Sequence, residues 1–158
     1  MTAAKLIAAL DEATALAARG EAVPEAVTDL VLRILGEAAD TPAVLDALRG
    51  ATAGRALLRI TDGARAIEFQ AGAGALRAEL AEPKGKGPKV DATAATWLGL
   101  LGGTLKPWLA FTRGQVVCRA GLSELRWLQQ VAERLQRGYG EARAILPGRP
   151  DQVRQDAD

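Results

Sequence analysis

Apolar residues recur every three or four positions through the first fifty residues, which is the spacing of one face of a helix. Gly20 and Gly50 interrupt this pattern, and Pro24 and Pro42 stand where a proline favours the first turn of a helix. Three helices are therefore predicted, over residues 3–18, from Pro24 onward, and over residues 42–48. We expect residues 1–50 to form an N-terminal helical extension.

Between residues 55 and 80 the apolar period changes to two, which is typical of half-buried strands. The Asp62-Gly63 pair separates the first two segments and is a strong hairpin signal. Three strands are predicted, over residues 55–60, 64–71 and 76–80. The segment that follows, residues 83–89, contains three lysines, two glycines and two prolines, and is expected to form a flexible basic loop.

The second half of the chain alternates between helix and strand patterns. Asp91 or Thr93 is expected to cap a helix that ends near Leu101. A short helical turn over residues 106–112, a strand over residues 115–120 and a closing helix over residues 122–136 follow. From Gly138 onward the chain is rich in Gly, Pro and charge, so residues 138–158 are expected to form a flexible tail. Segregated strands and helices predict an α+β fold.

The composition excludes several kinds of chemistry. The chain of 158 residues has no histidine and one cysteine, Cys118, so a Ser-His-Asp triad, a Cys-His pair and the usual His/Cys metal site are impossible. No disulfide can form within the chain. The formal net charge is +1 with basic residues scattered among acidic ones, which disfavours nucleic acid as a partner.

The hydrophobic fraction of 49% contains few aromatic residues, only 4% of the chain, so the core is expected to be aliphatic. Such a core suits a helical layer and also suits an apolar ligand. No run approaches about 18 apolar residues, so no transmembrane helix is predicted. The first residues lead into an amphipathic pattern rather than the apolar block of a signal peptide, and a cytoplasmic location is predicted.

The segment from Gly103 to Gly121 has a distinctive order of residues. A glycine precedes an apolar residue, a proline and an Ala-Phe pair, and a second glycine leads through a strand to a third. These residues are Gly103, Leu105, Pro107, Ala110, Phe111, Gly114 and Gly121. Together with the apolar helix before it and the hairpin at Asp62-Gly63, this spacing resembles the signature of the sterol carrier protein type 2 family over residues 52–137.

The resemblance implies a fold and a ligand. Members of that family have a twisted sheet covered on one face by helices, and a tunnel between the two layers takes sterols, fatty acyl chains, acyl-CoA or phospholipids. Residues 51–137 are therefore expected to form a lipid-binding domain with a mainly antiparallel sheet. The expected partner is an apolar small molecule or lipid, which the protein carries or presents.

The residues of this segment favour the same function on physical grounds. Gly103 and Gly114 permit sharp turns on either side of a short apolar helix, which can act as a flap over a cavity. Each methylene of an acyl chain that such a cavity buries contributes about 0.8 kcal/mol, so binding needs no catalytic group. We expect a binding protein without enzymatic activity, metal or cofactor. The predicted ligand-facing residues are Leu98, Leu101, Leu105, Trp108, Phe111, Leu125 and Leu128.

Two other functions are compatible with the sequence. In the first, the same fold has a filled core and serves as an interaction module that recruits a protein through its N-terminal helices. In the second, an enzyme acts through carboxylates, for which Glu68 and Glu79 on adjacent predicted strands are the candidates, although both are expected to face solvent. A continuous apolar cavity would favour lipid carriage, whereas a closely packed interior would favour the interaction module.

Several side chains have both a structural and a functional interpretation. Trp97, Trp108 and Trp127 either fill the core, or the first two line the ligand cavity and the third marks a protein or membrane contact. Cys118 is expected to be a buried, unreactive thiol because no histidine can act as its base. The lysines of residues 83–89 are expected to be solvated, the alternative being a transient contact with an anionic membrane surface.

Overall fold

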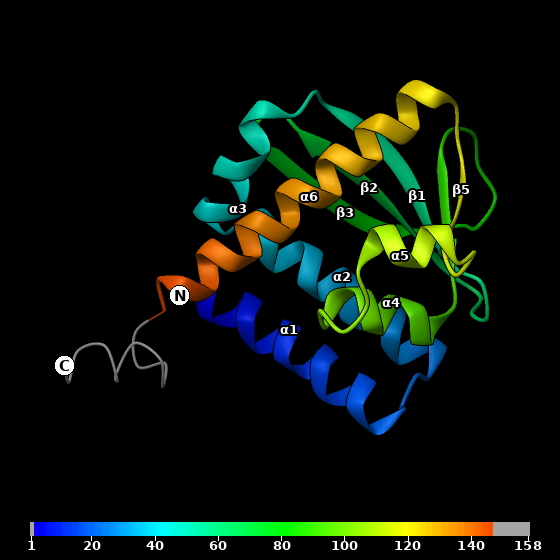
Figure 1. Ribbon diagram of the computed structural model, residues 1–158, viewed down its shortest axis with the longest axis horizontal. Coiled ribbons are helices and arrows are strands. Elements are labelled where there is room, and N and C mark those ends of the chain that lie inside the picture. Colours follow the sequence, from blue (N-terminus) through cyan, green and yellow to red (C-terminus); the bar gives the residue numbers. More distant parts are fainter. Residues whose placement is uncertain (1, 147–158) are drawn as a thin grey trace.

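The computed structural model describes residues 2–146, which form helices packed on one mixed sheet (Figure 1). The helices are α1 (Thr2–Arg19), α2 (Pro24–Ala39), α3 (Pro42–Ala47), α4 (Ala94–Leu101), α5 (Pro107–Thr112) and α6 (Leu122–Ala144), with the 3-10 turn η1 (Leu48–Gly50). The strands are β1 (Gly54–Ile60), β2 (Ala66–Gly72), β3 (Ala75–Ala81), β4 (Lys89–Ala92) and β5 (Val117–Arg119).

The strands are ordered β3-β2-β1-β4-β5 across the sheet. The pairs β2–β3, β1–β2 and β4–β5 are antiparallel, and β1–β4 is parallel. The prediction of an α+β fold with a mainly antiparallel sheet is therefore confirmed. Figure 1 shows α6 crossing in front of β1, β2 and β3, with α1, α2 and α4 beside it.

Alternation along β1 and β2 decides which face of the sheet meets the helices. Leu58, Ile67 and Phe69 are buried in the core, while Arg55 and Glu68 lie on the other face and pair with each other. The helical layer thus covers the apolar face, as a sheet with alternating residues requires.

The N-terminal helices belong to the same core as the sheet. Leu6 and Leu10 of α1 and Val27, Val31 and Ile34 of α2 are all buried in one continuous apolar cluster with the inner strand residues. Helix α1 packs against α2 and α4, and α2 packs against β3. Residues 1–50, expected as an extension, therefore contribute one side of the main core.

Helix α6 runs to Ala144, so its predicted end near Gln136 is wrong. In sequence the glycines at 138 and 140 resemble helix breakers, but Gly138 is needed where α6 crosses α3. A Cβ at this position would lie 2.8 Å from the Cα of Val44. Residues 138–144 are thus helical rather than a tail, and residues 147–158 lie outside the described part of the chain.

Strand β4 was not predicted, because only four residues form it and their partners lie on β1 and β5. Of the two predicted caps for the next helix, Thr93 is the correct one. Its hydroxyl oxygen accepts a hydrogen bond from the Thr96 amide at 3.3 Å. Asp91 instead points out of β4 into an ion-pair network that is described below.

Candidate functional site

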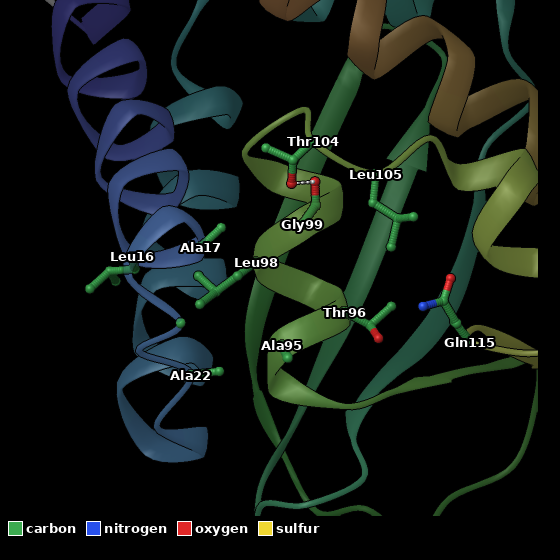
Figure 2. Close-up of a pocket in the computed structure, with 11 residues that line it drawn as sticks. Leu16, Ala17, Ala22, Ala95, Thr96, Leu98, Gly99, Thr104, Leu105 and Gln115 are labelled. Atoms are coloured by element: carbon green, nitrogen blue, oxygen red, sulfur yellow. Dashed lines mark hydrogen bonds between the residues drawn. The ribbon is translucent and has the colours of Figure 1, made fainter.

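A groove of about 290 Å³ runs over α4 and is the candidate ligand site. Its lining includes two small residues of α4, Ala95 and Gly99, and Leu105 packs so closely over Gly99 that a Cβ there would lie 3.1 Å from the Cβ of Leu105. Figure 2 shows Leu16, Ala17 and Ala22 on one side of α4 and Leu105 and Gln115 on the other. The complete lining is Leu16, Ala17, Gly20, Ala22, Ala95, Thr96, Leu98, Gly99, Thr104, Leu105 and Gln115.

Both ends of α5 border this groove. Thr104 and Leu105 precede the helix, Gln115 follows it, and all three line the groove. Just outside α5, Gly103 has φ 77° and Gly114 has φ 73°, backbone angles that favour glycine. A displacement of α5 about these two points would therefore change the shape of the groove.

Helix α5 turns its large side chains away from the core. Ala110 is fully buried, and its carbonyl oxygen accepts hydrogen bonds from the amides of Gln115 at 2.9 Å and Val116 at 3.2 Å. Trp108 is 69% exposed and Phe111 is 49% exposed. The helix is thus anchored through its smallest side chain while both aromatic rings face solvent.

The seven predicted ligand-facing residues fall into three groups. Leu98 and Leu105 are brought together in the groove. Leu101 and Leu128 are half-buried and pack against the core, and Leu125 is half-buried on α6. Trp108 and Phe111 are the exposed pair of α5. Ligand contact at these seven positions stays a prediction.

Comparison with known proteins identifies the fold. No family model matches the sequence, and no curated protein is significantly similar to it in sequence. A crystal structure of sterol carrier protein 2 aligns with a TM-score of 0.51 and 23% identity, over 64% of this chain and 86% of that chain. The chain has the fold of sterol carrier protein 2.

Two further solved structures are similar to a lesser degree. A conserved hypothetical protein from Thermus thermophilus, described as possibly a sterol carrier protein, has a TM-score of 0.49 and 24% identity, over 66% of this chain and 79% of that chain. The stereoselective inverting sec-alkylsulfatase Pisa1 from Pseudomonas sp. has a TM-score of 0.49 and 16% identity, over 68% of this chain but only 16% of that chain.

Within the sterol carrier protein 2 fold, two of the tryptophans are structural. The indole nitrogen of Trp97 donates to the carbonyl of Arg59 at 3.1 Å, and that of Trp127 donates to the carbonyl of Thr52 at 2.7 Å. The Trp127 ring also lies 6.4 Å from the ring of Phe69. Trp97 is buried in the core and Trp127 is half-buried against it, whereas the ring of Trp108 is exposed.

The sequence analysis missed an ion-pair network on the outer face of the sheet. The Asp91 carboxylate is buried and accepts hydrogen bonds from Arg59 Nε at 2.6 Å and Nη2 at 2.5 Å, and from Arg119 Nε at 3.0 Å. The Arg59 hydrogen bonds lower the pKa of Asp91, against the opposing effect of burial, and Arg119 adds to the lowering. Nothing in the sequence links these three residues, because only the strand pairing brings them together.

The candidates for covalent or acid–base chemistry lie apart from the groove. Burial, and to a lesser degree the charge of Asp91, raises the pKa of the half-buried Cys118 thiol. Glu68 and Glu79 stand opposite each other on β2 and β3, and Glu68 pairs with Arg55 at 3.7 Å. Neither carboxylate lines the groove.

A second, wider pocket of about 700 Å³ lies between α3 and the end of α6. Asp46, Arg49 and Glu141 contribute charged side chains to its lining, whereas no charged residue lines the groove over α4. In the part of the chain that the structure describes, no cluster of three or more His, Cys, Asp or Glu side chains is arranged to hold a metal. Among residues 2–146, no helix has the length and apolar character needed to cross a membrane.

Proposed function

We propose that this protein binds a lipid-like apolar ligand in the groove over α4, with α5 as a movable cover, and carries or presents that ligand. The observation that carries the proposal is that the segments on both sides of α5 line the groove, through Leu105 before the helix and Gln115 after it, while the aromatic side chains of α5 face solvent. Movement of α5 toward the groove would bury apolar surface that is otherwise exposed to water.

The size of the groove fits part of a lipid. Its volume of about 290 Å³ is at the lower end of the range for ligand sites, which is roughly 300–1,000 Å³. An acyl or isoprenoid segment fits this space, and opening of α5 would extend it toward the leucines of α4 and α6. Thr96 and Gln115 supply uncharged polar groups at the side of the groove.

The fold supports the same class of ligand. Sterol carrier protein 2 is named for carriage of a sterol, and this chain shares its fold. The ligand class proposed here includes sterols or isoprenoids, fatty acyl chains, acyl-CoA and phospholipids. A binding role without catalysis agrees with a sequence that lacks histidine and with a cysteine whose thiol pKa is raised.

The alternative, recruitment of a protein through the N-terminal helices, has less support. The apolar stripes of α1 and α2 are buried against the rest of the core, as Leu6, Leu10 and Ile34 illustrate. A partner can reach these stripes only if the helices detach. The exposed positions of these two helices carry mainly charged side chains and alanines rather than large apolar ones.

Displacement of a fluorescent fatty acid by fatty acids, sterols and phospholipids tests the proposal. Ala95 is exposed and lines the groove, so Ala95→Phe should fill the groove and weaken binding at least tenfold without disturbing the core. Ala8→Phe places the same ring on an exposed position of α1 outside the groove and should bind normally. Absence of binding by the wild-type protein would contradict the function, and normal binding by Ala95→Phe would contradict the site.

A further inference from the structure

The surface of α5 combines exposed aromatic rings with exposed positive charge. Trp108 and Phe111 are three residues apart, so they lie on the same side of the helix. Lys106 precedes the helix, Arg113 follows it, and both are exposed. We call these four residues the α5 surface. Two large, exposed apolar side chains on one short helix form an apolar patch, the kind of surface feature that marks interaction sites.

The chain segment that contains α5 carries basic residues and no acidic ones. From residue 92 to residue 123 the chain contains no Asp or Glu, while it contains Lys106, Arg113 and Arg119. The basic loop at 83–89 ends beside β5, since Lys89 pairs with Arg119 across the sheet. Figure 1 shows α5 and β5 on the side of the molecule away from the N-terminus and the end of α6. Since Arg119 pairs with Asp91, the positive charge that this segment presents to a partner comes mainly from the exposed Lys106 and Arg113.

We propose that the α5 surface docks on an anionic phospholipid bilayer, with Trp108 and Phe111 entering the interfacial region and Lys106 and Arg113 contacting the headgroups. Tryptophan favours the membrane–water interface, and basic residues gain from the negative surface potential of anionic lipids. The α1 and α2 apolar stripes are buried, so they do not compete for this role.

Charge argues against the other occupants. A second copy of the chain docked on the same surface would bring Lys106 and Arg113 against their own counterparts, which is unfavourable. An acidic protein partner would satisfy the charges, but it would also need an apolar pocket shaped to receive both rings. A bilayer satisfies both requirements at once. Docking there would place α5, the border of the ligand groove, at a source of lipid.

Vesicle flotation tests the proposal. The wild-type protein should float with vesicles of equal parts phosphatidylcholine and phosphatidylserine, float poorly with phosphatidylcholine alone, and detach as salt is raised. Tryptophan emission should shift to the blue on docking, because Trp108 leaves water, while Trp97 is already buried and Trp127 is already half-buried against the core. Equal flotation with both kinds of vesicle, or none with either, would overturn the proposal.

Two double variants separate the contribution of the aromatic rings to vesicle binding from that of the basic side chains. Trp108→Ser with Phe111→Ser, and Lys106→Glu with Arg113→Glu, should each weaken binding to the mixed vesicles at least tenfold. Two matched controls should not. Ile145→Ser changes a residue with 63% exposure at the far end of α6, and Arg77→Glu reverses an exposed charge on β3, at the opposite sheet edge from β5.

Failure of membrane docking can be distinguished from failure of ligand binding. The Lys106→Glu, Arg113→Glu variant should bind a fluorescent fatty acid as the wild type does when no vesicle is present, since neither residue lines the groove. Unchanged vesicle binding by the aromatic variant would overturn the docking proposal and leave ligand binding intact. Self-association through Trp108, or binding to a single-stranded oligonucleotide but not to vesicles, would also overturn it.

Discussion

Asp91 joins three strands through one carboxylate. It stands on β4, and its two arginine partners come from β1 and β5, so the network ties the parallel pair of strands to the short edge strand. The bidentate hydrogen bonds with Arg59 are of the stronger, charge-assisted kind. Arg119 is 64% exposed and contributes less, because water screens its interaction.

Asp91→Asn is expected to lower the free energy of unfolding by about 2 kcal/mol near neutral pH, since Arg59 loses a buried, charged acceptor. The folded-state pKa of Asp91 is lowered, so its contribution is present above the unfolded pKa of about 3.9 and is lost as the pH falls through the lower folded value. Urea unfolding at neutral pH and below pH of about 3 should therefore show a difference that shrinks in acid.

A control for this prediction is Glu68→Gln. Its partner Arg55 is largely exposed, so the expected change is below about 0.5 kcal/mol at either pH. A difference between wild type and Asp91→Asn that stays constant across the pH range would show that the charge of Asp91 is not what holds the strands.

At the scale of elements, the crossing of α3 and α6 depends on one missing side chain. A Cβ on Gly138 would lie 2.8 Å from the backbone of Val44, whereas a Cβ on Gly140, two residues later in the same helix, meets nothing within 4 Å. Gly138→Ala should destabilise the protein by about 1–3 kcal/mol through overpacking. Gly140→Ala should stabilise it by about 0.5–1 kcal/mol, because alanine favours helix.

Thermal unfolding of both variants gives the comparison. The melting temperature should fall for Gly138→Ala and rise for Gly140→Ala. A rise for both would mean that α6 is helical but does not approach α3 closely at this point. No change for either variant would return residues 138–144 to the flexible tail that the sequence predicts.

The helices and the meander were predictable because their signals are local. Pro24, Pro42 and Thr93 mark helix starts, and Asp62-Gly63 marks the hairpin, each within a few residues of the element it controls. Strand β4 was not predictable, because it depends on pairing with strands distant in the sequence. The end of α6 was not predictable either, because it depends on contact with Val44. A glycine has the same sequence signature whether it ends a helix or permits a close crossing.

The candidate site was predictable only in part, for the same reason. The flap between Gly103 and Gly114 follows from local residue order, and the structure places a short helix there. The groove itself needs Leu16, Ala17 and Ala22 from the α1–α2 corner, which the sequence analysis assigned to an extension. Spacing along the sequence does not show which residues, far apart in the chain, line the same groove.

At the scale of the whole molecule, the N-terminal helices and the sheet form one core, and the segment that contains α5 carries basic residues without acidic ones. The sequence totals suggested scattered basic residues, yet residues 92–123 carry no acid and contain α5. The groove and the basic α5 surface adjoin each other, because α5 borders the first and carries the second. Ligand binding and membrane docking are therefore separate proposals about neighbouring surfaces.

Native mass spectrometry of the purified protein tests ligand binding most directly. The 16.5 kDa chain should retain one lipid-sized molecule, or take up one on incubation with fatty acids, sterols or phospholipids, and organic extraction should release it for identification. Ala95→Phe should remain at the mass of the chain alone. A wild-type protein that stays at that mass before and after every incubation would contradict the account.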